Sequence, residues 1–443
     1  MRKFTSIKIS NVSLFKKNLL RWANGFQCCA VLVSNEWQEN ANEMIVAAGK
    51  IDEIVPTKNS FESLNFFHQK KNDWLFGFLS YDLKNETEDL ASKNFDGVCF
   101  PQMHFFQPES IFIVRRNRVE IGMLAEHAKE KEAEDLFHKI MNHRPKEEDC
   151  ISSFNIISRT SKKEYIRSVN EIRNHIQQGD IYEMNYCMEF YSENSEIIPE
   201  EIFFQLNETS QTPFSAYYRL DDKYMLCASP ERFLKKSGDK IISQPIKGTA
   251  KREKTREQDV YSKDNLFHSK KERSENVMIV DLVRNDLSKT CHSVCVEELY
   301  GIYTFKHWHQ MISTVSGVMR PNIHFTEVIK NAFPMGSMTG APKIRAMELI
   351  ERYEQTKRGL YSGAAGYITP DGDFDFNVVI RSILYNSSSK YLSFHVGSAI
   401  TANSDPDDEY KECLLKAKGM FEALRANDKL LIEQDEPNTF SHA

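Results

Sequence analysis

The chain has 443 residues, of which 41% are hydrophobic, so it is long enough to bury a large core. Its 57 basic and 63 acidic residues give a formal net charge of -6, which argues against nucleic acid or an anionic membrane as a partner. The nine cysteines are scattered without zinc-site spacing, and the sequence has neither a membrane-length apolar run nor a cleavable leader pattern. These features predict a reduced, cytoplasmic protein.

Composition divides the chain into four predicted parts. Residues 1–125 mix short apolar runs with polar stretches, which indicates strands in an α+β unit without a recognisable catalytic constellation. Residues 126–159 are rich in Lys and Glu and predict a connecting helix, a linker and a short strand over 150–158. We expect the chemistry in residues 160–425 and a polar tail over 426–443.

The clearest local signal is a capping box, Ser161-Lys-Lys-Glu164, followed by apolar residues at helical spacing as far as Gly179. Further helical patterns lie near 264–289, 342–354 and 406–425. Strand-like runs separated by turn signals fill the intervening sequence.

A first hairpin is predicted where runs 232–236 and 240–244 flank the turn Ser237-Gly-Asp239. A turn centred on Gly238 places Glu231 opposite Pro245, so Glu231 and Lys247 emerge at the same open end. A surface ion pair is the alternative explanation for these two residues. However, Lys247 stands between an apolar residue and Gly-Thr, and burial lowers the proton affinity of a lysine, which makes its amine a usable nucleophile.

A second hairpin is predicted around the signal Pro370-Asp-Gly372, between runs 362–369 and 374–384. Its centre places Tyr361 opposite Ser382. Arg381 interrupts the apolar run 378–384, and a buried arginine requires an anionic partner. That partner is either a carboxylate of the protein or the carboxylate of a ligand.

Two pairs of glutamates recur at a spacing of three on predicted helices. Glu272 and Glu275 precede an apolar stripe, with Glu275 on the apolar face, and Glu409 and Glu412 repeat the spacing in a helix opened by Asp405-Pro406. Two such pairs facing one cavity suit Mg²⁺, which prefers carboxylate and water oxygens. The alternative is a solvated helix face.

The segment Met335-Gly-Ser-Met-Thr-Gly-Ala-Pro342 leads into a predicted helix, so backbone N–H groups between Ser337 and Ala341 are candidates to bind an oxyanion. The ending of a phosphate-binding P-loop is missing.

Five ordered motifs closely resemble the chorismate-binding enzymes, a family that includes anthranilate, aminodeoxychorismate, isochorismate and salicylate synthases. The motifs are Ser229-Pro-Glu-Arg-Phe233, Pro245-Ile-Lys-Gly-Thr249, the stretch from Glu275 to Asp286, Gly340-Ala-Pro-Lys343 and Gly363-Ala-Ala-Gly-Tyr367. The resemblance covers residues 160–425. It implies one large α+β sandwich of two sheets, with helices packed outside and the active site between the sheets.

The resemblance distinguishes among family members at two positions. Lys247 in Pro-Ile-Lys-Gly-Thr is similar to the aminodeoxychorismate synthases, whereas anthranilate synthases carry Ala there. Glu183 stands where isochorismate and salicylate synthases carry a water-activating Lys. The resemblance thus implies that Lys247 adds to C2 of chorismate while Glu231 protonates the departing C4 hydroxyl, after which ammonia attacks C4 and expels the lysine. Anthranilate synthase component I and a catalytically silent homologue are the alternatives.

The same resemblance implies a set of ligands. Glu275 and Glu412 would hold Mg²⁺ directly, with Glu272 and Glu409 acting through water, and the metal would bind the ring carboxylate. The remaining substrate contacts would come from Gly248 and Thr249 at that end, the Ser337 hydroxyl, and Tyr361, Arg381 and the backbone of Gly397, Ser398 and Ala399 around the enolpyruvyl carboxylate.

Three departures from the family pattern shape the expectation. Gln310 stands where the family usually carries a His, and because Gln cannot shuttle a proton we expect it to orient the C4 hydroxyl. The N-terminal segment Val31-Leu-Val-Ser-Asn35 lacks the acidic residue of the tryptophan-binding motif in anthranilate synthases, so tryptophan inhibition is not expected. The sequence carries no glutaminase-type Gly-x-Cys-x-Gly, and a separate glutaminase subunit is therefore expected to supply ammonia.

Overall fold

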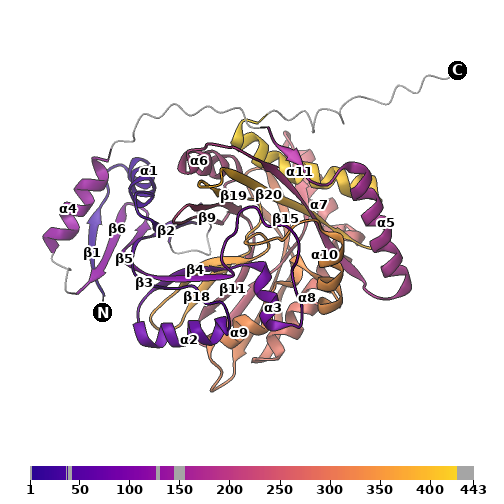
Figure 1. The fold of residues 1–443 in the computed structure, drawn as a ribbon, viewed down its shortest axis with the longest axis horizontal. Coiled ribbons are helices and arrows are strands. Elements are labelled where there is room, and N and C mark those ends of the chain that lie inside the picture. Colours follow the sequence, from indigo (N-terminus) through magenta and orange to yellow (C-terminus); the bar gives the residue numbers. More distant parts are fainter. Residues whose placement is uncertain (1, 36, 38–41, 126–129, 144–154, 427–443) are drawn as a thin grey trace.

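The strands of the computed structural model form one network of antiparallel ladders with two branches (Figure 1). The structure describes residues 2–35, 37, 42–125, 130–143 and 155–426. The first branch runs through β1 (Arg2–Lys8), β6 (Arg118–Leu124), β5 (Met103–Arg115), β3 (Met44–Ile54), β2 (Cys28–Val33), β9 (Phe214–Leu220), β10 (Lys223–Ser229), β19 (Ser382–Asn386), β20 (Tyr391–Ile400) and β8 (Glu183–Ser192), with the short β7 (Ile157–Ser158) and β16 (Gly340–Ala341) on β8.

The second branch leaves the first at β5. It runs through β4 (Leu75–Leu79), β17 (Ala364–Ile368), β18 (Phe374–Asn377), β11 (Arg232–Ser237), β12 (Lys240–Gln244) and β15 (Trp308–Met319). Strand β15 also pairs with β13 (Ile246–Lys251) and β14 (Cys291–Thr304).

Helices cover the outside of the strand network, and Figure 1 shows α6 and α11 on one outer face and α2 and α9 on the opposite one. The helices are α1 (Val12–Ala23), α2 (Ser60–Lys71), α3 (Lys84–Thr87), α4 (Glu130–Met141), α5 (Lys162–Gln178), α6 (Pro199–Ser210), α7 (Arg256–His268), α8 (Lys270–Ser288), α9 (Phe325–Ala332), α10 (Lys343–Tyr353) and α11 (Pro406–Leu424), with 3₁₀ turns η1 (Tyr81–Leu83) and η2 (Gly336–Met338). No helix in the described ranges combines the length and apolarity needed to cross a bilayer.

Two hydrophobic cores hold these layers together. The inner core joins the two branches and includes Phe78 of β4, Met225 of β10 and Phe376 of β18. The outer core packs the first branch against helices, as where the rings of Phe190 and Phe394 lie 5.3 Å apart and that of Phe421 lies 5.4 Å from Phe394. The predicted mixed α+β fold with external helices is confirmed.

Three of the four predicted helices form as expected, namely α5, α10 (predicted at 342–354) and α11 (predicted at 406–425), and the fourth is incomplete. The capping box of α5 forms, with Glu164 N–H donating to the Ser161 hydroxyl, and the helix stops at Gly179 with φ 85°. The pattern over 264–289 is two helices instead of one, because Ser269 ends α7 and caps α8 by accepting from Glu272 N–H.

The first hairpin reaches the predicted register by a different route. Its turn has two residues, since Ser237 pairs with Lys240 and Gly238 adopts φ 58°. A bulge between Arg232 and Lys235 then shifts the pairing by one residue and sets Arg232 opposite Gln244. Glu231 therefore lies beside Pro245, as expected.

The second hairpin forms beside its predicted turn, where Ile368 of β17 pairs with Phe374 of β18, but it does not extend as far as Tyr361 and Ser382. Strand β18 ends at Asn377, Arg381 adopts φ 49°, and β19 pairs with β10 in the other branch. Tyr361 therefore does not face Ser382. Residues 378–384 are mostly apolar because β18 and β19, the two strands they connect, are both buried. Hydrophobic periodicity therefore does not reveal that the chain passes from one branch to the other here.

The predicted boundaries are only partly covered. Residues 126–129 and 144–154 of the connecting segment and 427–443 of the expected tail lie outside the described residues, while α4 and β7 lie in the described remainder of the connecting segment. The N-terminal part contributes strands to both branches, because β2 pairs with β9 and β4 pairs with β17.

Candidate active site

Lys247 lies in a bulge of β13 that turns its side chain towards the first branch. The pairing with β15 shifts between Ile246 and Thr249, and Gly248 adopts φ 94°, a conformation that favours glycine. The Lys247 Nζ atom lies 2.5 Å from Glu183 Oε1 on β8, and both side chains are at least nine-tenths buried. The ion pair thus joins the two branches at the site.

The charge state of Lys247 differs from the expectation. Burial alone lowers its pKa, but the carboxylates of Glu183, Glu275 and Glu231 outweigh burial and raise the pKa above the ordinary value. The sequence showed only the apolar and Gly-Thr neighbours of Lys247, not the carboxylates that the fold brings to it. The raised pKa favours the ammonium form of Lys247, and a nucleophilic role would require a proton acceptor.

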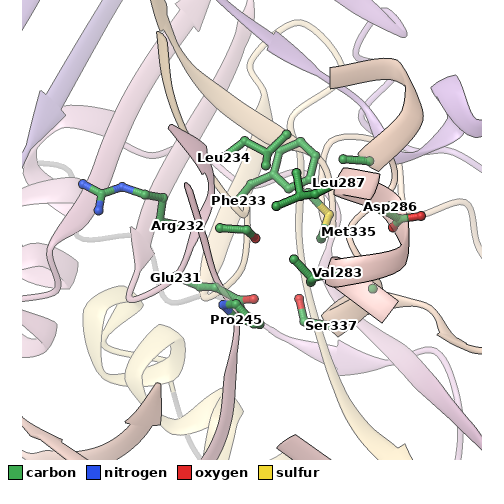
Figure 2. A pocket seen from close by; sticks show the side chains of 13 residues that line it. Glu231, Arg232, Phe233, Leu234, Pro245, Val283, Asp286, Leu287, Met335 and Ser337 are labelled. Atoms are coloured by element: carbon green, nitrogen blue, oxygen red, sulfur yellow. The ribbon is translucent and has the colours of Figure 1, made fainter. Parts of the chain in front are cut away.

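Glu231 is buried immediately before β11, and its carbonyl accepts from Val378 N–H at 3.0 Å. Burial raises the pKa of Glu231 to about 7, and the Ser337 hydroxyl, Lys247, the Ile246 N–H and Arg381 limit the rise. Figure 2 shows the Glu231 carboxylate directed towards Ser337 beside Pro245. A carboxyl with this pKa is suited to donate a proton near neutral pH.

Arg381 follows β18 at the point where the chain changes branches. Burial lowers its pKa to about 10, and Glu231 opposes that effect. Among the described residues, no side chain forms a hydrogen bond or ion pair with its guanidinium. Of the two partners expected for Arg381, the structure supplies no direct protein carboxylate.

Tyr361 is buried on the first-branch side. Its ring stacks on His395 with centroids 5.1 Å apart, and its hydroxyl accepts from Cys187 Sγ at 3.9 Å.

The segment Gly397, Ser398 and Ala399 lies in β20 opposite Cys187, Tyr186 and Asn185 of β8. The Gly397 carbonyl accepts from Lys416 Nζ at 2.9 Å, and the Ser398 hydroxyl bonds Tyr165 at 2.8 Å.

The loop around Ser337 is less open than expected. The N–H groups of Met338 and Thr339 donate to the carbonyls of Met335 and Gly336, so they are not free for an oxyanion. The prediction was wrong for these two groups because the loop closes into the 3₁₀ turn η2. Ser337 remains beside Glu231.

Gly248, Thr249 and Gln310 border the opposite end. A Cβ on Gly248 would lie 3.0 Å from Glu272 Oε2, so β13 passes close against α8. Thr249 is exposed and pairs with Gln310, which is buried and has an Oε1 atom without a hydrogen-bond partner in the described ranges. The neighbouring His309 bonds Asp259 at 3.0 Å and Thr304 at 2.9 Å, so it does not substitute for the missing histidine.

Helices α8 and α11 bring the two glutamate pairs together as a four-glutamate cluster of Glu272, Glu275, Glu409 and Glu412. Lys271 Nζ lies 3.6 Å from Glu409 and 4.0 Å from Glu275, and its pKa is raised by all four carboxylates against the effect of burial. Burial raises the pKa of Glu275 to about 7.

A family profile described as chorismate binding enzyme matches residues 17–422. The chain belongs to the chorismate-binding enzymes. It is 30% identical to aminodeoxychorismate synthase component 1 of Bacillus subtilis over 368 residues, which cover 80% of this chain and 77% of that protein. It is 31% identical to an anthranilate synthase component I-like protein of Synechocystis over 377 residues, with 83% and 75% coverage.

Solved structures show the same fold. Anthranilate synthase component I of Streptococcus pneumoniae superimposes with a TM-score of 0.76 at 24% identity, covering 85% of this chain and 91% of that one.

The family resemblance implies Mg²⁺, and the four-glutamate cluster has a donor set suited to it. Carboxylate oxygens are the ligands that Mg²⁺ prefers, Glu275 Oε1 has no hydrogen-bond partner in the described part of the chain, and Lys271 already places a cation among the four residues. The carboxylates of the cluster do not adopt metal-binding spacing, since no three His, Cys, Asp or Glu of the described residues lie close enough together to hold an ion. Instead, Lys271 forms ion pairs with Glu275 and Glu409, and Lys416 Nζ lies 2.7 Å from Glu412 Oε1.

Sequence reasoning did not assign three residues of this candidate site: Glu183, Lys271 and Lys416. Glu183 was used only to exclude water-adding enzymes, yet a charged residue at the head of a buried strand is a signal for a partner. Lys271 adjoins Glu272 and Lys416 follows Glu412 by one helical turn, which are also detectable signals.

Proposed function

We propose that the chain is an aminodeoxychorismate synthase that converts chorismate and ammonia to 4-amino-4-deoxychorismate and water. The observation that carries the proposal is the buried Lys247, held 2.5 Å from Glu183, which raises its pKa most, with Glu275 and Glu231 adding to the effect. This arrangement offers a nucleophile, a proton acceptor and a proton donor in one site. Relatives named aminodeoxychorismate synthase component 1 support the same product.

In the first displacement, Glu183 takes a proton from the Lys247 ammonium, across the 2.5 Å that separates the two groups. The free amine adds to ring carbon C2, and the C4 hydroxyl leaves as water with the proton of Glu231. The pKa of Glu231, about 7, keeps a substantial fraction of that carboxyl protonated at neutral pH.

In the second displacement, ammonia adds to C4 and the C2–nitrogen bond to Lys247 breaks. The proton lost by the added nitrogen returns to Glu231, and Lys247 recovers its proton from Glu183. The sum consumes one ammonia and releases one water, and nitrogen ends para to the ring carboxylate. Without a lysine to add first, ammonia would add at C2 and give the ortho product.

The remaining site residues would bind chorismate and orient its reacting groups. The buried Arg381, whose guanidinium has no hydrogen bond or ion pair with a described side chain, would receive the enolpyruvyl carboxylate. Gln310 would hold the C4 hydroxyl through its unpaired amide oxygen. When bound by Glu275 and Glu412, with Glu272 and Glu409 behind them, Mg²⁺ would supply positive charge opposite the ring carboxylate. The name component 1 in the relatives supports a separate glutaminase subunit as the source of ammonia.

Anthranilate synthesis is the second candidate, favoured by the Synechocystis relative named as anthranilate synthase component I-like. The two candidates differ at one product-determining position, because direct addition of ammonia needs no lysine.

The test incubates the purified chain with chorismate, Mg²⁺ and ammonium chloride, followed by aminodeoxychorismate lyase. We expect 4-aminobenzoate, and mass spectrometry of the quenched reaction should detect an adduct on Lys247. Lys247→Ala should lose more than 99% of this product, because the first displacement is removed. Formation of anthranilate by the unaltered chain, or full activity of Lys247→Ala, would overturn the proposal.

A further inference from the structure

Arg358 is a fully buried arginine that lies behind the site, in the loop between α10 and β17. Its guanidinium uses all five N–H groups that an arginine possesses. The acceptors are Glu354 Oε2 at 2.9 Å, Glu354 Oε1 at 2.6 Å, the Met338 carbonyl at 2.6 Å, the Asn185 carbonyl at 2.9 Å and the Ser362 hydroxyl at 3.4 Å.

Apart from the Glu354 carboxylate, these acceptors belong to three separate walls of the site. Met338 follows Ser337, Asn185 follows Glu183 by two residues, and Ser362 follows Tyr361. Asn185 adds a second connection between two of the walls, since its side chain donates to the Ser337 carbonyl at 3.0 Å. Arg358 therefore joins the η2 loop, strand β8 and the Tyr361 loop at one point.

The charge of Arg358 is compensated within the same group of residues. Glu354 pairs with the guanidinium and accepts from the Cys187 N–H of β8 at 2.9 Å, which ties it to the wall that carries Glu183. The ring of Tyr81 in η1 lies over the guanidinium with its centroid 4.6 Å away, and Tyr81 N–H donates to the Gly359 carbonyl at 2.7 Å. The N-terminal part of the chain thereby supports Arg358 from behind.

We propose that Arg358 is a positioning residue that sets the spacing of Ser337, Glu183 and Tyr361 around chorismate. It acts through the neighbouring Met338 and Asn185 carbonyls and the Ser362 hydroxyl, and it does not touch the substrate. Its role in turnover rests on the proposed function, whereas its role in binding rests only on membership of the chorismate-binding family. A lysine retains the charge but offers three donors from one atom, so it cannot span three segments and Glu354 simultaneously.

Arg2 provides a matched control. Its buried guanidinium also pairs with a carboxylate, Asp73 at 2.8 Å, and donates to the backbone carbonyls of Pro108 and Glu109. It lies in β1, at the far end of the first branch from β8. Arg2→Lys therefore reproduces the loss of a buried planar ion pair without disturbing the site.

The experiment compares Arg358→Lys, Arg2→Lys and the unaltered chain. Melting temperature measures the structural cost, calorimetric titration with chorismate in Mg²⁺ measures affinity, and the ammonium-dependent assay measures kcat/KM. We expect a similar loss of melting temperature in both variants, but only Arg358→Lys should bind chorismate about tenfold more weakly and lower kcat/KM about a hundredfold. Its activity should also persist to higher pH, because a displaced Ser337 no longer lowers the pKa of Glu231.

Guanidinium rescue separates positioning from general destabilisation. Arg358→Ala should regain affinity for chorismate in guanidinium chloride at concentrations below those that unfold it, and sodium chloride of equal ionic strength should not restore it. Arg358→Lys with unaltered affinity, or equal loss of affinity in Arg2→Lys, would refute the positioning role. If the unaltered chain forms no product, the proposed function fails while the affinities still decide the role of Arg358.

Discussion

At the scale of single residues, the local charge environment decides the chemistry of the site. Lys247 stands beside Ile246 and Gly248 in the chain, which suggested a neutral amine, but Glu183, Glu231 and Glu275 raise its pKa. The lysine is therefore protonated until a base accepts its proton, and Glu183 is the nearest group. In the proposed mechanism, the reactivity of Lys247 depends on proton transfer within this ion pair.

We expect kcat to fall as pH rises through about 7, because Glu231 must be protonated to release the C4 hydroxyl. Glu231→Gln should reduce kcat by about 10²- to 10⁴-fold, since an amide cannot donate that proton. A pH–rate profile measures the effect. A profile that stays flat between pH 6 and 9 would exclude Glu231 as the acid.

The same carboxyl links stability to pH. Its folded pKa is raised above its unfolded value, so the folded protein binds more protons between about pH 4.5 and 7, and its stability falls as pH rises through that window. Between pH 5 and pH 8, the free energy of unfolding of Glu231→Gln should therefore rise by on the order of 3 kcal/mol relative to that of the unaltered chain. Urea denaturation at the two pH values measures this difference, and an equal effect at both would contradict it.

Lys271 places an ammonium where the proposed metal would bind. Lys271→Met should raise the affinity for Mg²⁺ about tenfold, because a competing positive charge is removed from the four-glutamate cluster. The metal-free variant should melt at a lower temperature, since Glu275 and Glu409 lose their counter-charge. Calorimetric titration with MgCl₂ and melting with and without metal test both effects.

Lys270→Met is the control, because Lys270 is an exposed neighbour with the same charge. If both substitutions change Mg²⁺ affinity equally, Lys271 has no specific role.

At the scale of elements, the β13 bulge turns a regular strand into part of the site. The left-handed Gly248 lets β13 pass against Glu272 of α8 and displaces Lys247 from the ladder towards β8. A second irregularity, at residues 378–381, carries the chain from β18 to β19 and places Arg381 between the branches. Hydrophobic periodicity did not reveal either irregularity, because each depends on which distant strand the segment pairs with.

Gly248→Ala should destabilise the fold by about 1 to 3 kcal/mol and weaken Mg²⁺ binding, because φ 94° is strained for Ala and the new methyl group meets Glu272. Gly179→Ala, at φ 85° with open space around it, bears the conformational cost alone. Chemical denaturation should show a loss of stability in both variants. Only Gly248→Ala should change the Mg²⁺ titration, and unaltered binding in that variant would exclude the contact with Glu272.

At the scale of the whole molecule, the N-terminal part is built into the same strand network as the site. Strand β4 lies between β5 and β17, β2 lies between β3 and β9, and the inner core includes Phe76 and Phe78. The division at residue 125 remains a prediction about composition. The strand pairing does not follow it.

Removal of residues 1–125 should therefore prevent folding, because it exposes the edges of β9 and β17 and opens the inner core. We expect residues 126–443 to aggregate on expression or to melt without cooperativity. Solubility and circular dichroism measure this outcome. A soluble fragment with cooperative melting and chorismate binding would show that the catalytic part folds alone.

By itself, the sequence determined the family motifs, the mixed α+β class, the α5 capping box and the approach of Glu231 to Lys247, because each depends on local spacing or hydrogen bonds between near neighbours. Only the tertiary structure decided that Glu183 holds Lys247, that Lys271 and Lys416 engage the four-glutamate cluster, and that Arg358 joins three walls of the site. Most of these contacts join segments that are far apart in the chain, and the sequence pattern does not indicate how such segments align with one another. Their energies arise from burial and from charges that the fold alone brings together.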